Sequence, residues 1–300
     1  PPWAGLSGQI ALALKEVVYA GTFQANDVTG TLRLDAGALK FDGVRAGFGT
    51  GSDAKLSGAV TFDAKAATPY ALNADLAVME FDPAPLFKAL NPGQAATVEG
   101  KFNVTSKLTG QAVRLDEFPT TAHGDFQLSS KGGVFRGLPV SVSTKNEAIG
   151  KVASLLAIGG SALDALKSRK DDSEITSTAK AVAEVSKMLS AIPYDQLSVA
   201  LSRDESLNTV LKDFTLISPE MRLTGSGRAT HQAGATLLEE ALAMEFKLRA
   251  RGHTGDLLKY LGKLETQPDE LGYSACTLPL RVGGTIGKPA SPCRILQTTL

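Results

Sequence analysis

Apolar residues stand at every second position in many short segments of this sequence. Residues 70–78 give the longest example, in which Tyr70, Leu72, Ala74, Leu76 and Val78 alternate with alanine or polar residues. Side chains of a β-strand point to opposite faces of the sheet with a period of two, so each segment is expected to have one apolar and one polar face. This pattern is typical of antiparallel strands that cover a core on one side and meet water on the other.

Turn signals and helical spacing divide the 300 residues into strand blocks and an insert. About thirteen strands are predicted, with short connections before about residue 140 that favour a meander over parallel βαβ units. We expect one domain over 1–300, with a strand block at 7–140, a helical insert at 145–192 and a second strand block at 194–290. Within the insert, apolar residues recur at helical spacing in two parts, and Pro193 ends the second. Short helices are also expected from Asp82-Pro83 to Leu90 and from Thr254 to Leu264.

A sheet of this size with one apolar face cannot remain flat and uncovered. Open twisted sheets of more than about ten strands curl, split or flatten. The predicted fold is therefore mainly β with a helical insert, a long curved antiparallel sheet folded over its apolar side. Aromatic residues make up only 6% of the chain, and many strand positions hold small residues. Two interpretations of the interior stay open: a fully packed core, or an incompletely filled apolar groove that accepts apolar ligands.

The composition excludes several classes of protein. Lysine plus arginine and aspartate plus glutamate each number 31, and no long basic stretch marks a nucleic-acid partner. No segment approaches the roughly 18 consecutive apolar residues of a transmembrane helix.

The start at Pro1-Pro2-Trp3 shows neither an initiator methionine nor a signal peptide, so we expect the native chain to be longer at this end. Cys276 and Cys293 could form a disulfide in an oxidising compartment, or remain separate.

Motifs for catalysis, metals and cofactors are not recognised in the sequence. His123, His231 and His253 are far apart and lack metal-ligand spacing, and no Gly-x-Ser-x-Gly elbow is present. Residues 282–289 resemble a phosphate loop superficially, but Pro289 stands where a magnesium-binding hydroxyl would be. Gly225-Ser226-Gly227 is interpreted as a bulge or turn. We therefore expect no enzyme, no catalytic residues, no metal and no cofactor.

Several glycine-punctuated strands, taken in order, resemble the C-terminal region of the AsmA family. The resemblance rests on residues 29–41 (TGTLRLDAGALKF), 98–104 (VEGKFNV), 133–139 (GVFRGLP), 221–229 (MRLTGSGRA) and 278–289 (LPLRVGGTIGKP), and so covers nearly the whole chain. AsmA-like proteins are related to TamB and the bridge-like lipid-transfer proteins. They usually carry an N-terminal anchor in the bacterial inner membrane and project a β-rich body into the periplasm.

The resemblance implies a non-enzymatic periplasmic domain that binds phospholipid or other lipid acyl chains, or conducts them between membranes in envelope biogenesis. It implies a membrane partner through an anchor outside this chain, other envelope proteins as further partners, and no nucleic acid. The insert helices are expected to pack on the sheet, or to plug the groove. The alternative is an assembly factor for outer-membrane proteins that acts through an exposed strand edge; a hydrolase with an unrecognised site is a third interpretation. The expected lipid-binding residues are Ile10, Leu12, Leu14, Leu32, Leu34, Leu56, Phe62, Leu72, Leu76, Val78, Phe102 and Val104.

Overall fold

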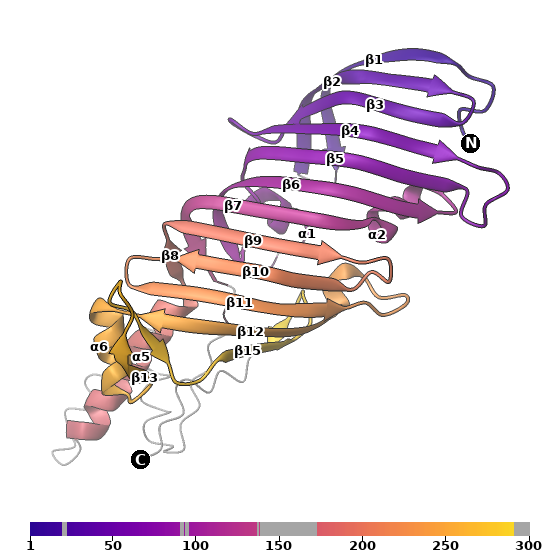
Figure 1. Cartoon of the computed structure of the whole chain (residues 1–300). Coiled ribbons are helices and arrows are strands. Elements are labelled where there is room, and N and C mark those ends of the chain that lie inside the picture. The colour runs from indigo at the N-terminus through magenta and orange to yellow at the C-terminus, as the bar shows by residue number, and fades with distance from the viewer. Residues whose placement is uncertain (20–22, 91–92, 94–95, 137, 139–172, 291–300) are drawn as a thin grey trace.

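The computed structural model describes residues 1–19, 23–90, 93, 96–136, 138 and 173–290. In these residues the chain forms a single open antiparallel sheet of sixteen strands (Figure 1). The N-terminal block contains β1 (Gly8–Tyr19), β2 (Phe23–Asp35), β3 (Ala38–Gly47), β4 (Asp53–Phe62), β5 (Tyr70–Phe81), β6 (Val98–Ala112) and β7 (His123–Phe135). The C-terminal block contains β8 (Ile192–Tyr194), β9 (Gln196–Arg203), β10 (Thr209–Ile217), β11 (Met221–Thr230), β12 (Ala241–Ala250), β13 (Leu264–Pro268), β14 (Ser274–Cys276), β15 (Leu280–Gly284) and β16 (Pro289–Ala290).

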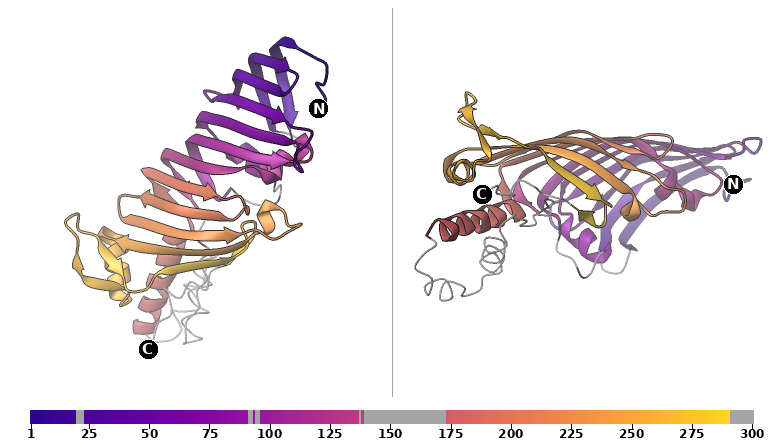
Figure 2. Two further views of the ribbon diagram at one scale, coloured as in Figure 1. Left: turned by 45° about the vertical axis from the view of Figure 1, so that its right-hand side comes forward. Right: turned by 90° about the horizontal axis from the view of Figure 1, so that it is seen from below.

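The strand order confirms the predicted meander. Strands β1 to β7 follow one another across the sheet, β9 pairs directly with β7, and β10 to β12 continue in sequence order. The sheet is arched, and its concave side faces the helices (Figure 2). The number of strands differs from the predicted thirteen because β8, β14 and β16 are only two or three residues long, too short to show alternation in sequence.

Bulges keep the apolar residues on one side where the sequence breaks its period. In β10 the alternation is interrupted at Lys212-Asp213, and the register shifts after Leu211 in the pairing with both β9 and β11. The extra residue returns Phe214 to the face that carries Leu211. A similar shift separates Val78 from Phe81 in β5.

The helices occupy few residues. They are α1 (Ala84–Leu90), α2 (Phe118–Thr121) after a 3₁₀ turn at Leu115–Glu117, α5 (Ser173–Ser190), a second 3₁₀ turn at Leu237–Glu239, and α6 (Gly252–Tyr260). The predicted cap is present at α1, where the Asp82 carboxylate accepts a hydrogen bond from the Ala84 amide at 2.9 Å. The helix α6 ends earlier than the predicted Leu264 because Gly262 adopts a left-handed φ of 65°. The second helix of the predicted insert is α5, whereas the first part of the insert and Cys293 lie outside the described residues.

Candidate functional site

Strand pairing gathers the apolar residues of successive strands on one face of the sheet, which we call the inner face. Leu34 lies opposite Leu39 of β3, and Leu39 lies opposite Val60 of β4. Val60 in turn lies opposite Leu72 of β5. Directly opposite residues of neighbouring strands point to the same side, so these side chains form a row across the strands.

The register places every predicted lipid-binding residue on the inner face. Ile10 pairs with Leu32, Leu56 with Leu76, and Val78 with Val104. Val78 and Phe102 are buried, with 8% and 4% of their surface exposed, so these two side chains are packed against neighbouring residues and are not accessible from solvent. The others are half-buried or exposed.

The inner face is most open on β1. Ile10 exposes 48% of its surface, Leu14 47% and Val17 40%. Val17 lies on this face because it pairs with Ala25, two residues from Phe23, whose ring meets the inner-face Phe81. Three large apolar side chains in one row on one strand form a continuous patch rather than isolated surface residues. Sequence reasoning did not include Val17, because the alternation of β1 breaks after Leu14, where the pairing with β2 is interrupted at Lys15 and Asp27 adopts a left-handed φ of 51°.

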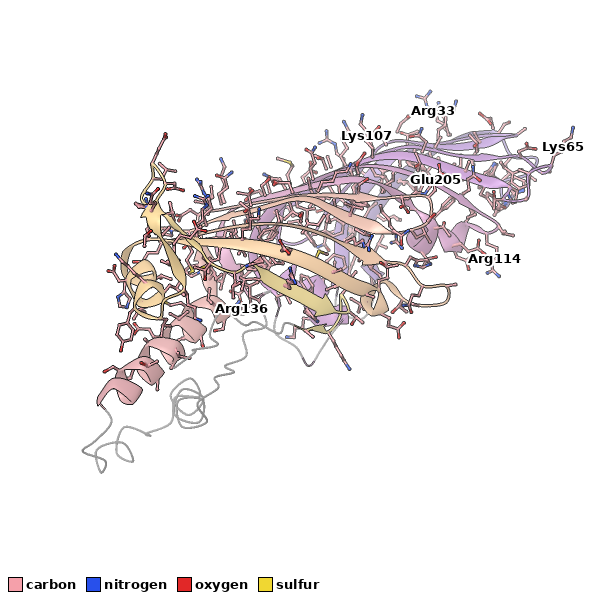
Figure 3. The ribbon with its side chains drawn as sticks, turned by 60° about the horizontal axis from the view of Figure 1, so that its bottom comes forward. Arg33, Lys65, Lys107, Arg114, Arg136 and Glu205 are labelled. Carbon is pink, nitrogen blue, oxygen red and sulfur yellow. The ribbon has the colours of Figure 1, made fainter. Side chains whose placement is uncertain are left out.

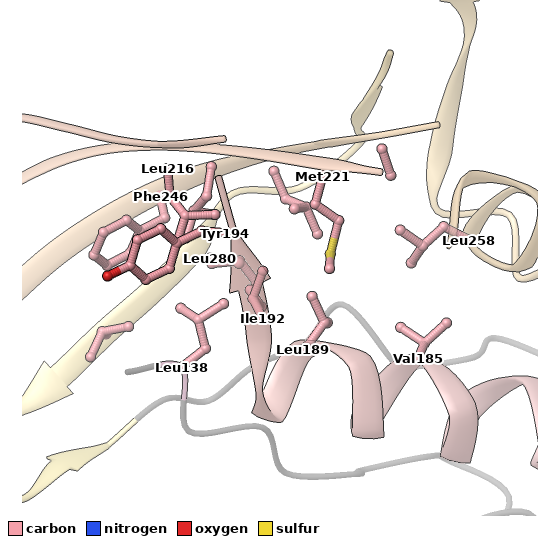
Figure 4. Close-up of a cluster of buried hydrophobic side chains, with 14 of the residues drawn as sticks. Leu138, Val185, Leu189, Ile192, Tyr194, Leu216, Met221, Phe246, Leu258 and Leu280 are labelled. Carbon is pink, nitrogen blue, oxygen red and sulfur yellow. The ribbon is translucent and has the colours of Figure 1, made fainter. Parts of the chain in front are cut away.

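The C-terminal half of the inner face is filled. Val182, Val185 and Leu189 of α5 have no exposed surface. With Ile192 and Tyr194 of β8 they pack against the inner-face residues of the strands above (Figure 4). The other strand residues of this cluster are Phe102, Leu197, Leu211, Phe214, Leu216, Met221, Leu223, Phe246, Leu248, Ala250, Leu280 and Val282. The inner face is thus open at β1 and closed beneath β9 to β12.

Aromatic side chains line both strand ends of the open half. At one end Tyr70 meets Trp3 with ring centroids 6.0 Å apart and Phe62 at 5.1 Å. At the other end the rings of Phe23 and Phe48 stack at 5.4 Å, and Phe81 lies edge-on to both. These clusters bound the inner face across its width. The side chains between them are mainly aliphatic, with Phe41 of β3, opposite Leu32, as an aromatic one.

The opposite, outer face is polar. Arg33 and Lys107 project from it (Figure 3). Ion pairs cross between strands there, with 2.9 Å between Arg33 and Asp42 and 2.7 Å between Lys212 and Asp125. A depression of about 590 Å³ on this face is lined largely by polar side chains of β4 to β7. The sheet therefore has one wet face and one apolar face, as the alternation predicts.

One buried ionic cluster was missed by sequence reasoning. Glu240 has no exposed surface, and its Oε1 lies 3.1 Å from Arg203 Nη2 and 3.1 Å from His231 Nδ1. Within the described residues, Glu240 Oε2 and Arg203 Nε find no hydrogen-bond partner. No motif spacing indicates this cluster, because Arg203 ends β9, His231 follows β11 and Glu240 precedes β12, and these residues meet only when β9 to β12 are assembled in order.

The chemistry available elsewhere in the described residues is limited. They contain no group of three or more His, Cys, Asp and Glu side chains placed to hold a metal ion. His123 begins β7, His231 follows β11 and His253 lies on α6, as strand-end and surface positions.

Comparisons of the sequence and structure with known proteins identify no relative of this chain. No family model matches the sequence, and no curated protein or solved structure is significantly similar to it. None of the helices in the described part of the chain combines the length and hydrophobicity that crossing a bilayer requires.

Proposed function

We propose that the inner face of β1 to β6 shields the acyl chains of phospholipids or similar lipids, without catalysis. The observation that carries the proposal is the row of apolar side chains that stays open to solvent at Ile10, Leu14 and Val17. Apolar surface of this kind gains about 25 cal/mol for each Å² removed from water, or roughly 0.8 kcal/mol for each buried CH₂ of a lipid tail.

The direction of the apolar row fits a conducting surface. The row runs across the strands, and neighbouring strands lie about 4.8 Å apart. Aliphatic side chains on successive strands offer an acyl chain similar surroundings at each step. A tail can therefore move along the row without breaking any specific contact.

The filled half defines where such a path ends. Helix α5 and β8 occupy the inner face beneath β9 to β12. In this proposal they act as a packed stop for the open half. Both interpretations of the insert helices, packing and plugging, are then aspects of one arrangement.

The resemblance to the AsmA family supports the cellular setting of the proposal. A protein of that family would be held at the bacterial inner membrane and would act in the periplasm on lipids moving between membranes. The polar outer face suits a body surrounded by water.

The test is a charge placed on the inner face. Leu76 is half-buried and lies opposite Leu56 and Ser106. With Leu76→Asp we expect loss of crosslinking to a phosphatidylcholine that carries a photoreactive acyl chain. The thermal unfolding transition should be retained, because the carboxylate stays hydrated at an open face.

Ala77→Asp is the matched control. Ala77 neighbours Leu76 in the chain but points to the outer face, opposite Lys55 and Thr105. This variant should crosslink like the parent. A parent protein that gives no lipid adduct, together with a Leu76→Asp variant that does not fold, would identify the inner face as a dry core and exclude the proposal.

The strand edge supports one alternative function. Strand β1 is 12 residues long, pairs only with β2 among the described strands, and contains no proline. Long unprotected edges accept a further strand. An assembly factor for outer-membrane proteins could use this edge. A peptide-binding assay with strand-forming segments of such proteins would favour it if Val18→Pro abolished binding and Leu76→Asp did not.

A further inference from the structure

A cavity of about 1240 Å³ lies beside α5, outside the row of residues discussed above. Its walls are the C-terminal part of α5, the chain around Pro193, the turn between β10 and β11, and the start of α6. Ligand pockets commonly measure roughly 300–1,000 Å³, so the volume suffices for a large ligand. Its apolar lining comes from Ala183, Met188, Ala191, Pro193, Pro219 and Met221.

Two methionines connect this cavity with the inner face. Met221 lies opposite Ala250 on the inner face and belongs to the packed cluster beneath β9 to β12. Met188 is half-buried on α5 and lies within 3.4 Å of the Thr254 hydroxyl. Unbranched thioether side chains adapt to ligands of different shape, which suits a site for flexible acyl chains.

The acidic groups of the cavity are already engaged within the protein. The Glu184 carboxylate lies 2.8 Å from His253 Nε2, and this hydrogen bond raises the pKa of His253. Glu220 accepts hydrogen bonds from the Thr254 hydroxyl at 2.7 Å and the Thr254 amide at 3.0 Å. The Glu184 carboxylate is therefore paired with His253, whereas Glu220 keeps its negative charge and is held at the β10–β11 turn by neutral donors.

The basic groups are available. Lys180 and Lys187 line the same cavity and are exposed, and within the described residues neither ammonium group has an acidic partner within 4.0 Å. Seven residues along a helix separate them by roughly 10 Å, and the flexible stems of both lysines can converge across that distance.

We propose that this cavity binds an anionic phospholipid, with an acyl chain against Met188 and Met221 and the phosphate accepting hydrogen bonds from Lys180 and Lys187. The assignment rests on the proposed function, since the lipid is one that the inner face would carry. The cavity would add selection for the lipid headgroup, which the apolar inner face does not provide. Charge-assisted hydrogen bonds to phosphate are stronger than neutral ones, so they can discriminate between headgroups that share the same tails.

The test uses short-chain lipids below their micelle concentration. Binding of dihexanoylphosphatidylglycerol and dihexanoylphosphatidylcholine to the whole chain is measured by isothermal titration calorimetry. We expect the anionic lipid to bind tighter by on the order of tenfold, and the double variant Lys180→Glu/Lys187→Glu to lose this preference. Lys40→Glu/Lys247→Glu, on the outer face, makes the same change in net charge and should keep the preference.

The outcomes separate the two proposals. Equal binding of both lipids by the parent, or a preference that survives in Lys180→Glu/Lys187→Glu, overturns the headgroup site. If Leu76→Asp still weakens that equal binding, the inner-face proposal stands. If the anionic lipid binds, and its binding is lost in Lys180→Glu/Lys187→Glu but unchanged in Leu76→Asp, the result supports the cavity site and not the inner-face proposal. If neither lipid binds the parent, both proposals fail.

Discussion

The ring of Phe246 lies directly over Gly225 of the neighbouring strand. A Cβ added to Gly225 would stand 2.2 Å from Cδ1 of that ring. On its other side Gly225 lies opposite Phe214, and the Phe214 and Phe246 rings meet above the glycine at 5.2 Å and 80°. The glycine thus provides the space in which an edge-to-face aromatic pair forms in the filled half of the inner face.

Gly225→Ala is therefore expected to destabilise the protein. The new methyl group must displace the Phe246 ring within a packed cluster, at a cost of roughly 1–3 kcal/mol. Urea denaturation followed by circular dichroism measures the change. The additional substitution Phe246→Leu should reduce the destabilisation caused by Gly225→Ala, because the smaller leucine leaves room for the new methyl group.

Gly283→Ala gives the matched control for this prediction. Gly283 also lies in a strand of the sheet, but the nearest atom to an added Cβ is 3.7 Å away, an ordinary contact. The urea midpoint of the Gly283→Ala variant should stay close to that of the parent. An equal loss in both variants would mean that glycine flexibility, not the Phe246 contact, sets the cost.

The open and filled halves of the inner face should respond differently to truncation. Leu189 has no exposed surface, so Leu189→Ala is expected to cost roughly 2–5 kcal/mol. Leu14 exposes 47% of its surface, so Leu14→Ala should change stability by only about 0.5 kcal/mol. The comparison uses the same chemical change at both sites and is read from denaturant midpoints. A large loss at Leu14 would mean that β1 is covered in solution.

The sequence predicts the inner face well because it depends only on a period of two. Each of Ile10, Leu32, Leu56 and Leu76 needs only its own strand's alternation to be placed, and bulges correct the period where it breaks. Short strands such as β8 carry too few residues to show any period.

Contacts between distant segments could not be predicted in the same way. The interpretation of Gly225-Ser226-Gly227 as a bulge or turn is partly met: the segment lies within β11, directly opposite a bulge whose extra residue is in β10. The space that Gly225 leaves is used by a residue 21 positions away. Similarly, Glu240 meets Arg203 only through the order of the strands, and nothing in either residue's neighbourhood indicates a buried pair.

Acid should weaken the attachment of α6 to the β10–β11 turn. Hydrogen bonds from Thr254 and the amide of His253 lower the pKa of the Glu220 carboxyl, with the Thr254 hydroxyl as the largest cause. A group whose pKa is lower in the folded than in the unfolded state stabilises the protein above its unfolded pKa, about 4.3 for glutamate. This contribution is lost as the pH falls through the folded pKa.

Thr254→Val tests this linkage. The variant should be less stable than the parent by about 1 kcal/mol at pH 7, since it loses one hydrogen bond to a charged, partly solvated group. The difference should shrink as the pH falls below 4, when the parent's carboxylate is protonated. Thr61→Val is the control: its hydroxyl donates to the Ala71 carbonyl at 3.5 Å, which does not titrate. Its effect on the urea midpoint should be the same at each pH.

The buried ion pair gives the sharpest stability prediction. Glu240 is fully buried between Arg203 and His231, whereas Glu245 forms a pair at 3.3 Å with Arg281 in which both side chains are largely exposed. Glu240→Ala leaves the guanidinium of Arg203, only 12% exposed, without its counter-charge, and should cost roughly 3–5 kcal/mol. Glu245→Ala removes a solvated pair and should cost less than about 1 kcal/mol.

In the double variant Arg203→Met/Glu240→Ala neither charge is left unpaired, so part of the stability should return. Denaturant unfolding of the parent, Arg203→Met, Glu240→Ala and the double variant gives the coupling energy between Arg203 and Glu240. A coupling energy near zero would show that Glu240 is held by its packing and not by the pair.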